Sequence, residues 1–235
     1  MDKFVQLGSL QVGLRPCVVG TVTSWAFLNN APADSFRECD LVEIRLDLIG
    51  IDYPWDAALQ RLQAVGMPLL VTIRAGYEGG SWNGVEEARA EIYRQAIPFC
   101  DAIDIELNSP VAAALCAWVR QKNKIAIVSH HNFKITPGRS ELQELVRRGQ
   151  EIGSIVKIAA TANSPVDVEN LRNLLNDDWE VPICVIGMGP LGAETRYEFP
   201  SLGSCLTYGY LDQPGAPGQP SAAWLLEKLG RKSGS

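Results

Sequence analysis

Short apolar segments alternate eight times with segments of helical pattern, and this alternation limits the fold more than any other feature of the sequence. The apolar segments predict strands at Cys17–Thr23, Leu41–Leu48, Pro68–Arg74, Ala102–Leu107, Ile125–His130, Ser154–Ala159, Ile183–Met188 and Ser204–Tyr210. The segments between them predict helices at Trp55–Val65, Val85–Phe99, Val111–Gln121, Arg139–Gly149, Pro165–Asn176 and Ser221–Leu229, with weaker patterns at Asp34–Glu38 and Pro200–Leu202. Strands that alternate with helices form a parallel sheet. Eight such units predict an α/β protein, a single (β/α)8 TIM barrel.

The length of the chain agrees with one such barrel. Its 235 residues are close to the roughly 250 that are typical of the fold. We expect one domain over residues 1–235, with its core at about 16–230 and a short flexible tail at 231–235. An open doubly wound sheet gives a similar alternation, but no G-x-G-x-x-G motif follows the first predicted strand. Ser164-Pro165 and Ser109-Pro110 both predict a helix start, with serine as the cap and proline in the first turn.

Composition excludes several classes of protein. The net charge is −6 and no Lys/Arg run is present, which argues against a nucleic-acid binder. No apolar run approaches the roughly 18 residues that a membrane helix needs. The six cysteines lack a C-x-x-C spacing, so zinc and redox motifs are absent. Free cysteines in apolar strands favour a reducing compartment, and we expect the protein to be cytoplasmic.

Charged side chains interrupt four of the predicted strands, at positions where a barrel is normally filled by apolar residues. They alternate with apolar residues and are Glu43, Arg45, Asp47, Arg74, Asp104, Glu106 and Lys157. Because outer faces of barrel strands pack under helices, period two places these charges inside the barrel. A buried charge is costly unless it is paired, and we expect pairs of Glu43 with Arg45 or Arg74 and of Glu106 with Lys157. Such pairs would also suit a purely structural ion layer.

Lys157 is the residue with the most specific chemistry. It lies among Ile155, Val156, Ile158 and Ala159, so desolvation favours the neutral amine, which attacks a carbonyl carbon to form an imine. A histidine pair, His130 and His131, ends the preceding predicted strand, and imidazole transfers protons near neutral pH. Adjacent residues point to opposite sides of a strand, so these two histidines do not predict a metal site. Which of them faces the lysine depends on the strand register.

Two late loops add features that suit an anion. Gly189–Gly192 and Thr195-Arg196 follow the seventh predicted strand, and 216–221 follows the eighth and opens the last helix. Barrel enzymes often bind anions at these two loops. Arg45, Arg74 and Arg196 together would hold a carboxylate, although a glycine-rich segment alone is more often a turn.

These residues resemble the type I 3-dehydroquinate dehydratases of the shikimate pathway. The matching motifs, in order from about Pro16 to Ser221, are Glu43-Ile-Arg45-Leu-Asp47, Thr72-Ile-Arg74, Glu78-Gly-Gly80, Asp104-Ile-Glu106-Leu107, Ser129-His-His131-Asn-Phe133, Thr136-Pro137, Lys157-Ile-Ala159, Gly187-Met188 and Ala216-Pro-Gly-Gln219. Each motif is weak by itself, but the ordered set is specific. The resemblance implies a β/α barrel, commonly a homodimer, that removes water from 3-dehydroquinate without a metal or other cofactor.

The resemblance also implies roles for individual residues. Lys157 matches the lysine that forms the imine, His131 the general acid–base and Glu78 the carboxylate that orients it. The positions that match substrate-binding or pocket-lining residues are Glu43, Arg45, Arg74, Arg196, Gln219, Met188 and Thr21, with Arg196 on the carboxylate. Gly215 departs from the family, which usually has a serine there, and the loss of one hydrogen bond costs roughly 1 kcal/mol. The lysine that often follows the methionine is absent, Thr195 replaces a serine, and His130 stands where tyrosine is common.

Two other functions fit part of the sequence. A class I aldolase also forms an imine on a barrel lysine, although three arginines suit a carboxylate better than a sugar phosphate. A barrel that binds a quinate-like ligand without turnover is the second, because the rim at Gly215 departs from the family pattern. Cleavage of a carbon–carbon bond, or tight binding without turnover, would distinguish these from the dehydratase.

Overall fold

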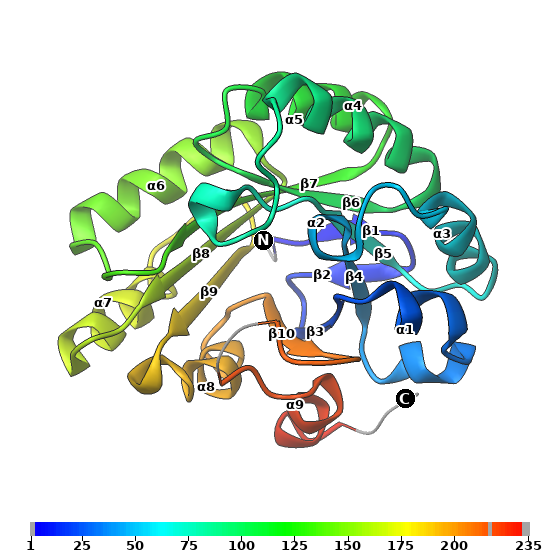
Figure 1. Ribbon diagram of the computed structural model, residues 1–235. Helices are drawn as coiled ribbons and strands as arrows, with labels where there is room; N and C mark the ends of the chain where they lie inside the picture. Colours follow the sequence, from blue (N-terminus) through cyan, green and yellow to red (C-terminus); the bar gives the residue numbers. More distant parts are fainter. Residues whose placement is uncertain (1–2, 216–217, 232–235) are drawn as a thin grey trace.

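A barrel of eight parallel strands forms the centre of the molecule, as predicted, and helices surround it (Figure 1). The computed structural model describes residues 3–215 and 218–231. The barrel strands are β3 (Cys17–Val22), β4 (Leu41–Arg45), β5 (Leu69–Thr72), β6 (Ala102–Glu106), β7 (Ile125–Asn132), β8 (Ile155–Thr161), β9 (Ile183–Met188) and β10 (Leu206–Tyr210). Their hydrogen-bonded order is β10-β3-β4-β5-β6-β7-β8-β9. Each predicted strand is therefore present, with ends that differ by no more than a few residues.

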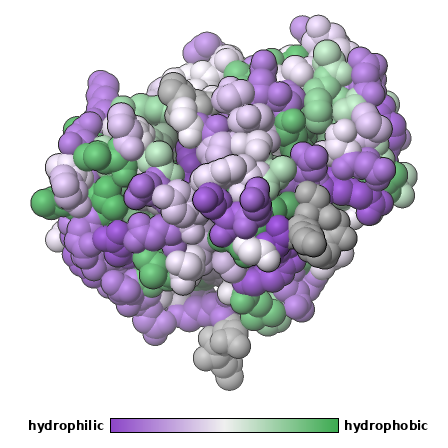
Figure 2. Space-filling model, turned by 90° about the horizontal axis from the view of Figure 1, so that it is seen from below, coloured by the Kyte–Doolittle hydropathy of each residue, from purple (hydrophilic) through white to green (hydrophobic). Residues whose placement is uncertain are grey.

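The helices follow the strands in the chain and cover the outside of the barrel (Figure 1). They are α1 (Trp25–Asn30), α2 (Leu46–Ile49), α3 (Trp55–Ala64), α4 (Glu86–Ala96), α5 (Ala112–Gln121), α6 (Arg139–Ile152), α7 (Pro165–Leu174), α8 (Thr195–Ser201) and α9 (Ala222–Lys228), with the 3-10 helices η1 (Ala33–Arg37), η2 (Gly76–Glu78), η3 (Ile97–Phe99) and η4 (Pro190–Gly192). The face that carries α9 shows small separate apolar areas among polar side chains (Figure 2). Among the described residues, no helix is long and apolar enough to span a membrane.

Helical spacing explains how the outer layer packs. In α6, the buried side chains are Leu142, Leu145 and Val146, with Gly149 one turn later, which places one apolar stripe on the barrel. The strands contribute their outward side chains to the same layer, including Val128 and Val156 on β7 and β8. The alternation read from the sequence thus produces a layer of apolar residues between helices and sheet.

A seam separates β9 from β10, the two ends of the hydrogen-bonded order. Ser204 bridges it, because its hydroxyl accepts a hydrogen bond from the Val185 amide at 3.0 Å and donates toward the Leu206 carbonyl at 3.2 Å. The backbone adds one bond from the Cys205 amide to the Ile183 carbonyl at 2.8 Å. The Ser204 side chain therefore replaces part of the backbone hydrogen-bond ladder between β9 and β10, where the barrel closes.

An N-terminal hairpin, which the sequence pattern did not predict, packs against the interior of the barrel. Its strands are β1 (Val5–Leu7) and β2 (Leu10–Val12), and they pair antiparallel. Leu7 and Val12 are fully buried and belong to an apolar cluster with inward residues of the barrel strands, among them Leu70 and Ile127. This cluster fills the barrel at the end where the strands begin, so the polar residues gather at the other end.

Local predictions were wrong in three places. Asp47 lies in α2 rather than in the second barrel strand. Ser109 does not cap α5, whose cap position is Val111 without a side-chain bond; its hydroxyl bonds the Glu86 carboxylate instead, at 2.5 Å. The helix expected near Pro200–Leu202 begins earlier, at Thr195. By contrast, Ser164 caps α7 and Pro165 lies in its first turn, as predicted, and the structure adds a full capping box with Asp167. Ala216, Pro217 and the tail residues 232–235 lie outside the described residues.

Candidate active site

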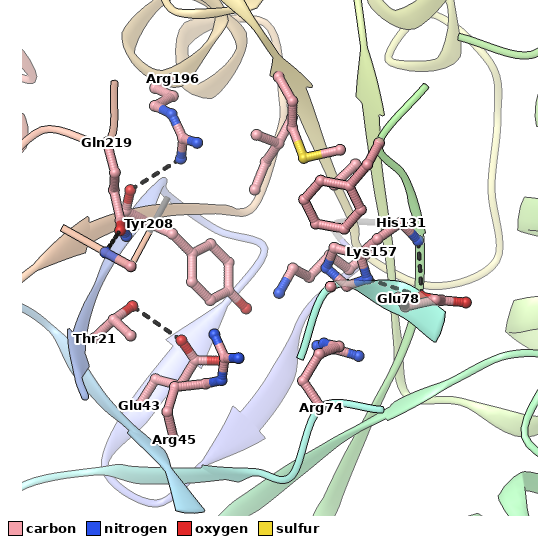
Figure 3. A pocket seen from close by; sticks show the side chains of 16 residues that line it. Thr21, Glu43, Arg45, Arg74, Glu78, His131, Lys157, Arg196, Tyr208 and Gln219 are labelled. Atoms are coloured by element: carbon pink, nitrogen blue, oxygen red, sulfur yellow. Dashed lines mark hydrogen bonds and ion pairs between the residues drawn. The ribbon is translucent and has the colours of Figure 1, made fainter. Parts of the chain in front are cut away.

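A pocket of about 290 Å³ opens where the barrel strands end, which is where barrel enzymes carry their active sites (Figure 3). It is lined by Thr21, Glu43, Arg45, Arg74, Glu78, Gly79, His131, Phe133, Lys157, Ala159, Ile186, Met188, Arg196, Tyr208, Gly215 and Gln219. All ten residues predicted for the site are in this set. The volume suits a molecule with one small ring.

Lys157 projects into this pocket from the third position of β8 and is buried. Its Nζ lies 3.0 Å from Oδ2 of Asp104 and 4.0 Å from the centre of the Tyr208 ring. The prediction that Glu106 would pair with Lys157 was therefore wrong. The amine is held between a carboxylate and an aromatic face.

Asp104 joins Lys157 to a larger group of buried charges. Its Oδ1 accepts hydrogen bonds from Arg74 and Ser129 at 2.7 and 2.6 Å. Burial by itself would raise the pKa of Asp104, but the cations of Arg74 and Lys157 outweigh burial and hold that pKa well below its usual value. Asp104 is therefore a permanent anion between two cations.

Glu106 contacts the same group of buried charges from its other side. It accepts from Arg74 at 2.9 Å, from the Ala75 amide at 3.0 Å and from Arg89 of α4 at 2.5 Å. Arg89 is fully buried and reaches Glu106 from outside the strands. Arg74 thus has two carboxylate partners, and these contacts fix its guanidinium at the edge of the pocket.

His131 and Glu78 form the second polar group of the pocket. The Nδ1 atom of His131 lies 2.9 Å from Oε2 of Glu78, and the same oxygen accepts the His131 amide at 2.9 Å. Burial, together with the nearby cations Arg74 and Lys157, lowers the pKa of His131 well below its ordinary value. Burial raises the pKa of Glu78 to about 7, against the opposite effect of Arg74. The imidazole is therefore neutral near pH 7 and can act as a base.

The register settles which histidine faces the lysine. His131 pairs with Ala159 and Ser129 with Lys157, so Ser129, His131, Lys157 and Ala159 share the inward face. His131 lines the pocket and His130 does not. The Nδ1 atom of His130 is 3.8 Å from Glu78, beyond hydrogen-bonding distance.

Close packing explains why glycine occupies two positions of the Glu78-Gly79-Gly80 motif. Gly79 has φ 79°, and a Cβ there would lie 2.4 Å from the Phe133 ring. A Cβ on Gly80 would lie 2.0 Å from the Arg74 carbonyl oxygen. The two glycines let the chain turn tightly after β5, which brings the Glu78 carboxylate back over the end of β7.

Glu43 and Arg45 end β4 without the pairing that the sequence suggested. Glu43 accepts from the hydroxyls of Thr21 and Thr72 at 2.9 and 2.8 Å. Arg45 forms two bonds with Asp47, from Nε at 2.9 Å and from Nη2 at 2.8 Å. The expected pairs of Glu43 with arginine were therefore wrong, although both side chains still line the pocket.

Arg196 differs from the other two arginines. It lies on α8, across the pocket from Arg74 (Figure 3), and is 8% exposed. Its Nη1 donates to the Tyr208 carbonyl at 3.2 Å, and it has no ion pair among residues 3–215 and 218–231. Burial lowers the pKa of its guanidinium. A buried cation without an anion is the arrangement expected of an anion-binding site.

The late loops position the remaining predicted residues. Thr195 ties the end of β9 to the start of α8, since its hydroxyl accepts from the Gly187 amide at 2.8 Å and donates to the Gly192 carbonyl at 2.6 Å. Gln219 accepts the Gly215 amide at 2.8 Å, and Met188 is half-buried at the end of β9. Gly215 lines the pocket through its backbone alone.

Tyr208, Phe133 and Ile186 also line the pocket, and sequence reasoning gave them no role. Period two along β10, counted from the inward-facing Leu206, would have placed Tyr208 inside the barrel. Within the part of the chain that the structure describes, no three His, Cys, Asp or Glu side chains lie together as metal ligands would.

Comparisons with known proteins point to one family. A sequence model of the type I 3-dehydroquinase family matches residues 19–232. The 3-dehydroquinate dehydratase of Methanocella arvoryzae is 36% identical over 214 residues, which cover 91% of this chain and 95% of that protein. The relative from Methanothrix thermoacetophila is 36% identical over 218 residues, covering 91% and 92%.

Solved structures give the same result. The 3-dehydroquinate dehydratase of Geobacillus kaustophilus superposes with a TM-score of 0.88 at 25% identity, covering 97% of this chain and 95% of that one. The enzyme from Aquifex aeolicus has a TM-score of 0.78 at 30% identity, covering 90% and 96%. The chain therefore belongs to the type I 3-dehydroquinase family.

Proposed function

We propose that this member of the family dehydrates 3-dehydroquinate through an imine on Lys157, with His131 as the general acid–base. The observation that carries the proposal is the position of a neutral imidazole and a buried lysine on adjacent inward positions of β7 and β8. Both face one small pocket that also holds a buried, unpaired arginine within the described residues. The substrate has a ketone, a carboxylate and ring hydroxyls, and the pocket offers a group for each.

Arg196 binds the substrate carboxylate in this proposal. Arg45 and Arg74 already hold carboxylates of the protein, whereas the Arg196 guanidinium has, among the described residues, only a backbone carbonyl as its partner. A carboxylate at Arg196 satisfies the buried cation. It also leaves the ketone on the side of Lys157, with the ring hydroxyls near Glu43 and Arg45.

Lys157 supplies the nucleophile. The ammonium transfers its proton to His131 and the amine nitrogen bonds to the ketone carbon. His131 then returns this proton to the departing oxygen, which leaves as water and gives the protonated imine, so the imidazole is neutral again. Asp104 then stabilises the positive charge of the protonated imine at the same nitrogen, 3.0 Å away in the structure. This stabilisation acidifies the neighbouring C–H bond.

His131 moves the protons of the elimination. Its Nδ1 is bound to Glu78, so Nε2 is the nitrogen available to substrate. Nε2 removes the proton next to the imine, and the C–H electrons form the enamine double bond. The enamine expels the β-hydroxyl, which takes the proton from His131 and leaves as water. Hydrolysis of the conjugated imine returns Lys157 and consumes the water released when the imine formed, so one water is lost overall.

Two measurements test this mechanism. Purified protein with 3-dehydroquinate should produce the ultraviolet-absorbing conjugated enone. Borohydride added during turnover should leave one stable adduct, and peptide mass analysis should place it on Lys157. Lys157→Met should lose both signals, whereas the matched change at exposed Lys122, outside the pocket, should lose neither. Enone formation with an adduct elsewhere, or with none, would refute the imine on Lys157 while leaving the dehydration intact.

The remaining properties stay predictions of the sequence and the family resemblance. They are the homodimer, the cytoplasmic location, the single-domain organisation and the lack of a cofactor requirement. Sedimentation of the purified protein measures the first of these.

A further inference from the structure

Tyr208 is a buried residue of the pocket whose hydroxyl has no hydrogen-bond partner among residues 3–215 and 218–231. It is 5% exposed, and four buried side-chain polar atoms among the described residues have no hydrogen-bond partner, its Oη among them. Of these four, only the Tyr208 oxygen belongs to a residue that lines the pocket. A buried hydroxyl without a partner costs free energy, so its retention calls for a partner from outside the protein.

The orientation of the side chain shows where such a partner would lie. Tyr208 extends from β10 with its hydroxyl toward the centre of the pocket (Figure 3). The face of its ring lies 4.0 Å from Nζ of Lys157. Its backbone carbonyl holds Arg196 at 3.2 Å. One residue therefore contacts both the imine-forming lysine and the arginine proposed for the carboxylate.

Burial, with nearby anionic groups such as Glu43, raises the pKa of Tyr208 well above its ordinary value. The phenol stays protonated near pH 7 and acts as a hydrogen-bond donor. Glu43 already accepts two threonine hydroxyls, and Asp104 accepts from Lys157, Arg74 and Ser129. The neighbouring carboxylates therefore already have donors, and the Tyr208 hydroxyl is suited to donate a hydrogen bond to an oxygen of the substrate.

We propose that Tyr208 is a substrate-binding and positioning residue. Its hydroxyl donates a hydrogen bond to a ring hydroxyl of the substrate, and its ring holds the Lys157 amine at the ketone carbon. The inference rests on the proposed function, because it assumes a hydroxylated cyclic ketone bound at Lys157. A neutral hydrogen bond of this kind corresponds to roughly a three- to tenfold change in kcat/KM.

Two variants separate the hydroxyl from the ring. Tyr208→Phe removes only the hydroxyl and should lower kcat/KM for 3-dehydroquinate by roughly three- to tenfold. It should not lower the unfolding midpoint, because the hydroxyl makes no hydrogen bond with the part of the chain that the structure describes. Tyr208→Leu removes the aromatic face as well and should lower activity further. Tyr210→Phe is the matched control, since it removes a phenol hydroxyl from the same strand outside the pocket, and it should behave as the unmodified protein.

A second probe identifies the group that the hydroxyl contacts. 3-Oxocyclohexane-1-carboxylate has the ketone and the carboxylate but no ring hydroxyls, and borohydride traps its adduct on Lys157. Tyr208→Phe should trap it at the unmodified rate, and Tyr208→Leu should trap it more slowly.

Three results would overturn the inference: full activity of Tyr208→Phe on 3-dehydroquinate, equal losses with both ketones, or a lowered unfolding midpoint. Lack of turnover by the unmodified protein would instead refute the proposed function.

Discussion

Replacement of Glu78 by glutamine tests the electrostatics of the pocket through stability alone. The structure gives this carboxyl a pKa of about 7 in the folded protein, against an ordinary value of 4.5. Each pKa unit corresponds to about 1.4 kcal/mol, so the rise amounts to about 3 kcal/mol. Because the folded pKa is raised, the carboxyl binds its proton more tightly in the fold than in the unfolded chain. Its contribution to stability is therefore complete below about pH 4.5 and is lost as the pH rises through 7.

Glu78→Gln removes this titration. The free energy of unfolding of the variant, relative to the unmodified protein, should increase by about 3 kcal/mol between pH 4.5 and pH 8. Denaturant unfolding of both proteins across this range measures the difference. The changed contact with His131 adds the same free energy at every pH, so it does not affect this change with pH. The titration of His131 occurs in both proteins and cancels from their difference to first order. Glu87→Gln, at an exposed position of α4, is the matched control and should show no such change.

Activity gives a second reading of the same substitution. In the proposed mechanism, ionised Glu78 accepts the Nδ1 proton of His131, which leaves Nε2 as the base. kcat/KM of the unmodified protein should therefore rise with pH through about 7. In Glu78→Gln this rise should be absent, and the plateau of kcat/KM at high pH should be lower. The amide can also donate a hydrogen bond to Nδ1, which stabilises the imidazole tautomer whose proton is on Nε2. A stability difference that stays flat, or that favours the variant more at low pH, would refute the raised pKa.

Four further substitutions address the histidines, the buried ion pair and the seam. His131→Ala should lower kcat by roughly 10²- to 10⁴-fold, whereas His130→Ala should keep most of the turnover, and steady-state assays with the reverse ranking would contradict the assignment. Asp104→Asn should lower the free energy of unfolding by about 3–5 kcal/mol, since it leaves two buried cations with one anion fewer; denaturant titration measures this, and a neutral effect would argue against the pairing. Ser204→Ala should cost about 1–3 kcal/mol by leaving the Val185 amide unpaired, while turnover of the folded enzyme should stay unchanged.

The sequence determined the architecture because the relevant information is local. Strand and helix periods, and the Ser164 cap, depend on neighbouring residues. They predicted eight units and the inward face of the four strands that carry charged residues. The same period placed Glu43, Arg74, Asp104 and Lys157 inside the barrel. The hairpin of β1 and β2 escaped prediction, because three-residue strands carry too little pattern to identify.

Contacts between strands required the tertiary structure. Lys157 lies in the same hydrogen-bonded row as Ser129 and Glu106, yet its partner is Asp104. Strands in an eight-stranded barrel tilt, so the residues of one hydrogen-bonded row change height along the barrel axis by about one residue per strand. Two strands away from Lys157, the residue at its height is therefore two positions before Glu106, which is Asp104.

For the chemistry, the sequence by itself determined which groups are available: the lysine that we propose forms the imine, a histidine pair and several buried charges. Only the tertiary structure decided how they combine. The β7–β8 register selected His131 over His130, and the barrel tilt gave Lys157 its carboxylate. Arg45 and Arg74 pair with carboxylates of the protein, which leaves Arg196 as the cation that we propose for a substrate anion. These outcomes depend on distances between residues far apart in the chain, which no local pattern encodes.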